Sequence, residues 1–323
     1  MIRSIKSEEQ LRLFFLSIVL LAGHLGMEAY LHGKRINDRL EMIGAGDAFN
    51  SNELSLLLAA IIPLVFVFIK NGKRFERIIA LGSLPFILNA FILCNSRGSA
   101  LAFVGGVIIS VIFVADKQIK KGMVILLIAI TPIFLYLTDD AYIERFSTLL
   151  GFSSAMEDEA AAQTLSSGRT EIWLYGFEMA KDHPFGVGPN GFKKLARFYM
   201  PKEVLTFKNG SSQGVRSAHN TYLQIIVEQG ILGIVIWCLM CLHTCLVLFK
   251  AFKMVSKLQH PKPFWKDSIF GLNIAFYSVL IGGFVNSRVY YEFFWWQLAI
   301  AAIVYSLASD IARQDKLKTN LNT

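Results

Sequence analysis

The feature that most constrains this chain is a series of long apolar blocks separated by short charged stretches. Each block is close to the ~20 residues that an α-helix needs to cross a bilayer. Hydrophobic residues make up 54% of the sequence and charged residues only 17%, fewer than a soluble globular domain carries. We therefore predict an all-α, polytopic transmembrane helical bundle of about eight spans. The expected spans are Leu13–Leu31, Leu54–Ile69, Ile78–Cys94, Ala100–Ala115, Gly122–Leu137, Thr221–Phe249, Ser268–Phe284 and Phe293–Ser309.

The distribution of positive charge predicts the orientation of the bundle. The short segments on one side hold 18 of the 32 Lys and Arg residues, whereas those on the other side hold five. Because Lys and Arg collect on the cytoplasmic side, we expect both termini in the cytoplasm. The long hydrophilic segment 138–218 is then an extracytoplasmic loop. This asymmetry also explains the net charge of +8, so we expect a lipid bilayer as partner and no nucleic acid.

The topology divides the chain into an N-terminal bundle (1–137), the loop (138–218), a C-terminal bundle (219–309) and a cytoplasmic tail (310–323). Within the loop, Arg169–His183 is predicted to form an amphipathic helix that can lie on the membrane surface. Residues 184–192 are predicted to form a turn-rich connector. The sixth apolar block is longer than a span, so its first turns are expected above the membrane, with His219 at the mouth of the loop.

Several patterns resemble cofactor or metal sites but are better explained in other ways. Gly186–Gly191 fits GxGxxG, yet a predicted helix precedes it and a proline interrupts it, so we interpret it as a backbone turn. The acidic runs Asp139–Asp140 and Glu157–Glu159 have no His or Asn beside them and are interpreted as solvated loop. Cys238-x-x-Cys241 stands alone in an apolar block and is interpreted as helix packing. We expect neither a metal nor a cofactor.

Arginines on the outer side, together with one histidine, are the candidates for chemistry. Arg97 lies in the tight turn between the third and fourth spans, where we expect no other charged residue, and Arg145 follows the fifth span. A guanidinium binds phosphate oxygens with two parallel hydrogen bonds and keeps its charge. For Arg288 we instead expect simple contact with lipid headgroups. His219 begins the sixth span from outside and is followed by Asn220.

A series of short motifs carries a family resemblance. The motifs are Asn95-Ser96-Arg97-Gly98, Gly168-Arg169 followed by Trp173, Asp182–Phe192, and Ala218–Gln224 followed by Glu228–Gly233. They resemble the O-antigen ligase and O-antigen polymerase superfamily of bacterial membrane glycan transferases. The spacing of His219-Asn220 and Gly230 is similar to the family's histidine motif, and Arg145–Leu149 is similar to its arginine element. Family members usually have ten or more spans, so the resemblance implies that some N-terminal spans are lacking here.

The resemblance implies an enzyme of the bacterial cytoplasmic (inner) membrane. It would move a glycan from a polyprenyl-diphosphate carrier to a hydroxyl of lipid A core, another glycan or a protein. Arg97 and Arg169 are expected to stabilise the leaving diphosphate, and His219 to act as the base, because an unperturbed histidine has a pKa near 6.5. Attack opposite the leaving group would invert the anomeric carbon without a metal. The expected substrate-binding residues are Arg145, Arg216, Asn220, Trp173 and Tyr222.

Three alternatives stay open at the level of the sequence. A polysaccharide polymerase of the same superfamily would use the same kind of donor with a growing glycan as acceptor. A flippase or permease would transport without chemistry, but transporters tend to show inverted repeats and polar residues at mid-membrane, and we find neither pattern. A non-catalytic partner subunit would be consistent with the lacking spans.

Overall fold

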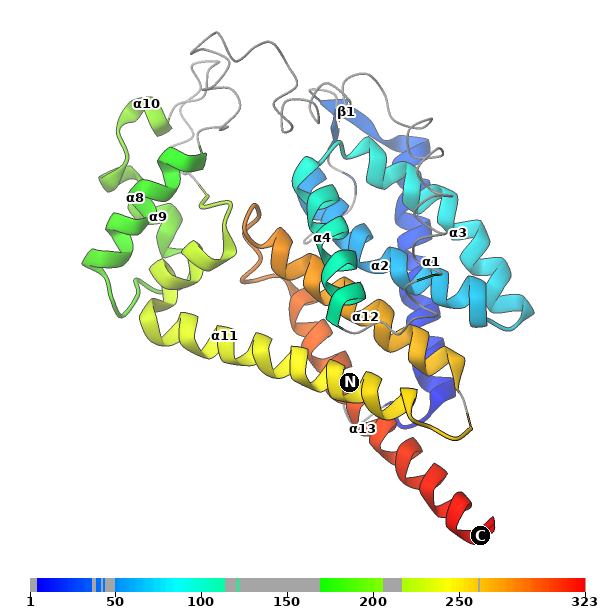
Figure 1. Ribbon diagram of the computed structural model, residues 1–323. Helices are drawn as coiled ribbons and strands as arrows, with labels where there is room; N and C mark the ends of the chain where they lie inside the picture. The colour runs from blue at the N-terminus through cyan, green and yellow to red at the C-terminus, as the bar shows by residue number, and fades with distance from the viewer. Residues whose placement is uncertain are drawn as a thin grey trace. The chain divides into compact units, whose positions relative to one another are not determined.

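The computed structural model describes residues 5–36, 39–41, 43, 50–113, 121, 169–205, 217–260 and 262–322 (Figure 1). These residues are mostly helical. The strands among them, β1 (Lys34–Ile36) and β2 (Arg39–Glu41), form one antiparallel hairpin in which Arg35 pairs with Leu40. The fifth expected span, Gly122–Leu137, lies outside the described residues.

Five of the described helices are long and apolar enough to cross a membrane, and each coincides with an expected span. They are α1 (Glu8–His32), α2 (Ser51–Asn71), α3 (Arg74–Leu93), α11 (Thr221–Ser256) and α13 (Glu292–Asn322). α4 (Arg97–Phe113) is a shorter apolar helix, and α12 (Pro263–Gly282) forms at the seventh expected span without being one of the five. The helical, multi-pass membrane class is therefore confirmed, while the number of eight spans stays a prediction.

Contacts between residues divide the chain into two compact units. Unit 1 comprises residues 1–139, 242–282 and 291–323, and unit 2 comprises residues 140–241 and 283–290. α11 contributes its first part, as far as Cys241, to unit 2 and the remainder to unit 1.

The core of unit 1 is built around α12, which packs against both α2 and α4 (Figure 1). Most of α12 is buried, including Trp265 and Phe276. Glycine permits the close approach of α4, because a Cβ atom at Gly106 would lie 2.2 Å from Ser278 Oγ and 2.8 Å from the carbonyl oxygen of Ile274. Small residues at such crossings let helix backbones approach closely in membrane proteins.

Ion pairs join the helices at one end of unit 1. Arg12 Nη1 lies 2.7 Å from Glu76 Oε2 and so connects the start of α1 to the start of α3. Lys70 Nζ lies 2.8 Å from Asp267 Oδ2 and connects the end of α2 to the start of α12. The charge distribution assigns these helix termini to the cytoplasmic side. Because the end of α2 lies with the starts of α1 and α3, these three helices alternate in direction.

We expect Gly106→Ala to lower the thermal stability of the protein, whereas Gly82→Ala does not. At Gly106 the added methyl group meets α12, and overpacking a well-packed interface costs about 1–3 kcal/mol. At Gly82, on α3, nothing lies within 4 Å of the added carbon. Alanine is there the better helix former by about 1 kcal/mol. Thermal unfolding of both variants in detergent checks this, and equal midpoints would contradict the packing of α4 on α12.

Candidate functional site

Unit 2 has a hydrophobic core of its own. α8 (Arg169–Asp182), α9 (Gly191–Tyr199), α10 (Lys202–Leu205) and the start of α11 share a cluster of buried apolar side chains. The helix expected over Arg169–His183 forms as α8, and one of its faces packs into this core. Ile172 and Met179 point into the core, whereas Phe177 is 55% exposed. The buried face of α8 therefore packs on protein.

α11 is interrupted at Gly230. This residue has φ 70° and ψ −168°, a conformation that is essentially open only to glycine. At the break, the carbonyl oxygens of Val227 and Glu228 accept hydrogen bonds from the backbone N–H groups of Val187 (3.1 Å) and Gly188 (2.9 Å). In return, Ile231 N–H donates to the carbonyl oxygen of Pro184 (2.9 Å). The turn-rich connector thus supplies partners for backbone groups that the helix leaves without i→i−4 bonds.

The glycines of the connector fit this break. Gly186 and Gly188 have φ values of 83° and 85°. A Cβ atom on Gly186 would lie 2.6 Å from both the Glu228 carbonyl oxygen and the Gly230 nitrogen, so two backbones touch here. α8 directly precedes the motif, and the described stretch 169–205 contains no strand. The interpretation of Gly186–Gly191 as a backbone turn is therefore confirmed.

His219 stands directly before α11 in a tightly held backbone. It has φ 45°, in the left-handed region, and its side chain is exposed. On one side, Trp173 Nε1 donates to the carbonyl oxygen of Ala218 (2.9 Å), which ties α8 to the residue before the histidine. On the other side, Asn220 Oδ1 accepts from Leu223 N–H (3.0 Å) and caps α11. The unusual backbone conformation is thus fixed from both flanks.

Three of the expected substrate-binding residues have structural contacts in unit 2. The amide oxygen of Asn220 is the helix cap, and the only N–H donor of the Trp173 side chain is bonded to Ala218. Tyr222 packs its ring against Phe284 (4.4 Å between centroids) and Trp237 (5.2 Å). Their roles in substrate binding stay predictions, although these contacts already explain the residue types.

The connector between α12 and α13, residues 283–290, is bonded to the start of α11. Thr221 N–H donates to the carbonyl oxygen of Gly283 (2.7 Å), and Thr221 Oγ1 donates to that of Asn286 (2.7 Å). Thr221 Oγ1 also accepts from the backbone N–H of Arg288 (2.9 Å). Arg288 is only 6% exposed. The expectation that Arg288 merely reaches to lipid headgroups is wrong, because Arg288 is buried against the segment that carries His219.

A buried carboxylate holds three separate segments of unit 2 together. Glu228 is 2% exposed and accepts from the N–H of Phe192 at the start of α9 (3.3 Å), from Gln224 Nε2 (3.3 Å) and from the hydroxyl of Tyr290. Burial and the neighbouring carboxylate raise the pKa of Tyr290 to about 12, so the phenol stays a donor. Sequence reasoning missed this cluster, because Tyr290 is 62 residues away and no spacing rule connects it to Glu228.

Arg97, in unit 1, is the first residue of α4 and is half-buried. Its turn is fixed by Asn52 Oδ1, which accepts from Ser96 Oγ (2.8 Å) and from Arg39 Nη2 (2.6 Å). Arg39 Nε also donates to the carbonyl oxygen of Cys94 (3.2 Å). The expectation that this turn has no charged neighbour is therefore wrong. The β-hairpin brings Arg39 to it from 55 residues away.

The expected site residues fall into both units. Unit 2 brings together His219, Asn220, Trp173 and Tyr222, and the backbone of Arg169 begins α8 there. Arg97 belongs to unit 1. Arg145, Arg216 and the two acidic runs lie outside the described residues. Among the residues that the structure describes, no group of three or more His, Cys, Asp or Glu side chains is arranged to hold a metal ion.

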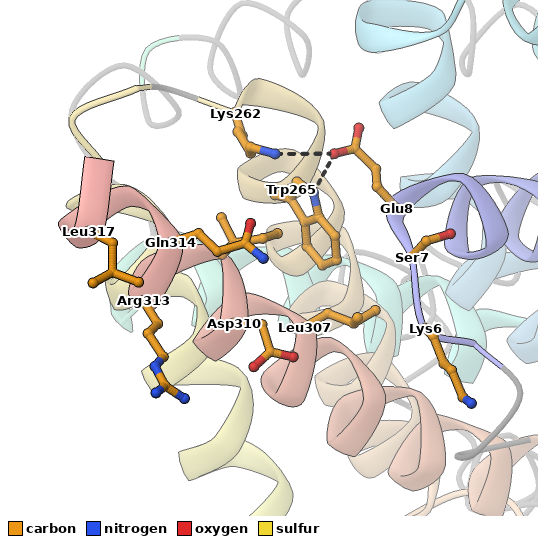
Figure 2. A pocket seen from close by; sticks show the side chains of 11 residues that line it. Lys6, Ser7, Glu8, Lys262, Trp265, Leu307, Asp310, Arg313, Gln314 and Leu317 are labelled. Atoms are coloured by element: carbon orange, nitrogen blue, oxygen red, sulfur yellow. Dashed lines mark hydrogen bonds and ion pairs between the residues drawn. The ribbon is translucent and has the colours of Figure 1, made fainter. Parts of the chain in front are cut away.

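A cavity of about 480 Å³ lies in unit 1 between the start of α1, the start of α12 and α13 (Figure 2). Lys6, Lys262 and Arg313 line it together with Glu8. Figure 2 shows Lys262 turned toward Glu8, 3.8 Å away, while Lys6 and Arg313 stand at opposite sides of the view. None of the expected site residues lines it.

These features define a multi-pass helical membrane protein with a histidine held before a broken helix. Residues 81–238 match the model of a family described as O-antigen ligase. The match confirms the resemblance drawn from the motifs, since residues 81–238 are similar to the O-antigen ligase family. At the level of the family, the match supports a membrane glycosyltransferase of the ligase or polymerase kind. No curated protein matches the chain.

We expect Gly186→Ala to destabilise unit 2 more than Gly188→Ala. Both substitutions place alanine at a positive φ, which costs about 1–2 kcal/mol. Only Gly186 adds a clash with the backbone of α11, since nothing lies within 4 Å of a Cβ atom at Gly188. Hydrogen exchange of peptides that cover residues 227–231 measures the effect, with faster exchange in Gly186→Ala. Equal exchange in the two variants would show that the connector does not stabilise the break.

Proposed function

We propose that the protein transfers a saccharide from a polyprenyl-diphosphate carrier to a hydroxyl acceptor on the outer face of the bacterial cytoplasmic membrane. In this proposal the reaction is ligase-like, inverting and independent of metal. The observation that carries it is the position of His219. Within the family-matched region, this exposed side chain sits on a left-handed backbone that is fixed from both flanks.

The proposed reaction makes one bond and breaks one bond. The acceptor oxygen attacks the anomeric carbon from the face opposite the carrier, and its proton passes to the imidazole of His219. The bond between the anomeric carbon and the diphosphate oxygen breaks, and the carrier leaves with the electron pair. The leaving group thereby gains negative charge, so fixed cations beside it lower the barrier more than they stabilise the bound donor.

Arg97 is the proposed cation on the carrier side in unit 1. Asn95, Ser96 and Ser99 in its turn are all at most 5% exposed, and Asn95 has φ 46°. A turn held this rigidly keeps the guanidinium in place before substrate arrives, which is the property that electrostatic stabilisation requires. Arg169 is the proposed second cation and begins α8. Arg145 and Arg216 keep their proposed roles as further phosphate ligands.

Replacing His219 by Ala is expected to abolish transfer and to make carrier-linked glycan accumulate in cells. Loss of a general base typically costs about 10²–10⁴ in rate. The measurement is the ratio of carrier-linked to acceptor-linked glycan at matched protein levels. His32→Ala is the control, because this exposed histidine pairs with Glu28 (3.0 Å) at the end of α1. Undiminished transfer by His219→Ala would contradict the base assignment.

Replacing Arg97 by Lys is expected to lower the turnover number, because lysine cannot make two parallel bonds to a phosphate. Removing one preorganised donor to a developing charge costs about 10²–10³ in turnover number. Arg77→Lys is the matched control, since Arg77 lies on the predicted cytoplasmic side and donates to the carbonyl oxygen of Lys70. Single-turnover kinetics with a lipid-linked donor separate this effect from binding. Equal rates for Arg97→Lys and wild type would remove Arg97 from the mechanism.

The ligase and polymerase alternatives differ in the acceptor. We propose the ligase alternative first, because the matched family is described as O-antigen ligase. An assay in which purified protein receives only the lipid-linked donor distinguishes the ligase from the polymerase. A polymerase lengthens glycan on the carrier, whereas a ligase needs an added acceptor and leaves the donor unextended without it.

A further inference from the structure

Thr221 joins the start of α11 to the connector between α12 and α13 with three hydrogen bonds. Its backbone N–H donates to the carbonyl oxygen of Gly283 (2.7 Å), because a residue in the first turn of a helix finds no acceptor within that helix. Its hydroxyl donates to the carbonyl oxygen of Asn286 (2.7 Å) and accepts from the backbone N–H of Arg288 (2.9 Å). One threonine side chain thus bridges two residues of the connector.

The same connector also reaches the other side of the histidine. Ser217, two residues before His219, brings its hydroxyl within 3.3 Å of that of Ser287. His219 itself has φ 45°, a backbone conformation that residues with a side chain keep only where the surrounding structure enforces it. Because the connector holds residues on both sides of His219, it limits how the backbone between them can move.

Burial makes the hydroxyl of Thr221 difficult to replace. Thr221 is 2% exposed and Asn286 is 4% exposed, so the bond between them lies away from water. Without the hydroxyl, the carbonyl oxygen of Asn286 loses this donor, and removing one partner of a buried hydrogen bond is costly. Valine has nearly the shape of threonine but carries no hydroxyl. Thr221→Val therefore breaks the bridge to the connector without leaving a large cavity.

We propose that Thr221 is a positioning residue for His219, because it anchors the backbone of the histidine to the connector 283–290. This inference rests on the proposed function, in which the imidazole takes the proton of the acceptor hydroxyl. It adds to the site a segment that lies outside the family-matched residues 81–238. A displacement of about 1 Å in a reacting group can cost about 10²-fold in rate, so the anchor affects turnover more than binding.

A role of Thr221 in folding alone is the alternative. In that case Thr221→Val would lower the amount of folded protein, but each folded molecule would keep wild-type turnover. A double-mutant cycle with His219→Ala tests the connection directly. A residue that acts through the imidazole loses its effect once the imidazole is removed, whereas the effects of independent residues on the rate multiply.

The experiment measures transfer by the full chain in membranes of cells that lack the wild-type protein, with the cell's own radiolabelled carrier-linked glycan as donor. Rates are divided by the amount of folded protein. We expect Thr221→Val to lower the rate by about 10 to 10² fold, while the amount of carrier-linked glycan that copurifies with the protein stays unchanged. Thr221→Ser keeps the hydroxyl and should keep most of the rate. Thr244→Val is the matched control, because Thr244 is a buried threonine of the same helix (4% exposed) that belongs to unit 1.

In the His219→Ala background, whose residual rate is read over long incubations, Thr221→Val is expected to change the rate by less than about twofold. Wild-type turnover per folded molecule in Thr221→Val would overturn the inference. A double variant whose loss is the product of the two single losses would also overturn it. If Thr221→Val does not fold, Thr221→Ala is judged by the same two results. Undiminished transfer by His219→Ala would instead contradict the proposed function, whatever Thr221→Val does.

Discussion

The architecture of unit 2 depends on one break in a helix. α11 would be a continuous membrane-crossing helix of 36 residues, but at Gly230 its backbone takes a conformation that side-chain-bearing residues avoid. An interrupted helix leaves backbone groups without partners, which membrane proteins tolerate only where protein supplies them. Residues 184–188 do so with three hydrogen bonds. Gly186 and Gly230 are therefore two halves of one contact, which explains why both motifs carry glycine.

The break also separates the first turns of α11 from the rest of the helix. Residues 221–229 pack with α8 and α9 through Leu223 and Val227, so they belong to a small protein core and not to the rest of the span. Glu228 adds hydrogen bonds from three segments in that core. His219, just ahead of this anchored helix start, stays exposed while its backbone is fixed. Such prior positioning is what a group that must meet a reacting atom requires.

Prediction from the sequence succeeded for elements whose signal lies in neighbouring residues. It failed where the burial or contacts of a residue depend on segments far away in the chain. Apolar block length located five helices that are long enough to cross a membrane, and the turn-rich connector from residue 184 correctly marked the end of α8. Turn chemistry correctly explained Gly186–Gly191. The burial of Arg288 was missed, because it follows from bonds to Thr221, 67 residues earlier. Arg39 beside Cys94 was missed for the same reason, since a β-hairpin creates that proximity. The buried face of α8 was missed because its partner is α9 and the start of α11.

The hydrogen bonds of unit 2 also limit which side chains are left for substrate. An indole has one donor, and that of Trp173 is bonded to Ala218, so only its ring remains for a sugar. The amide oxygen of Asn220 already caps α11. The ring of Tyr222 lies against Phe284 and Trp237. These contacts position the backbone around His219. In the proposed function the diphosphate is recognised by guanidinium groups, which bind phosphate oxygens through two parallel hydrogen bonds.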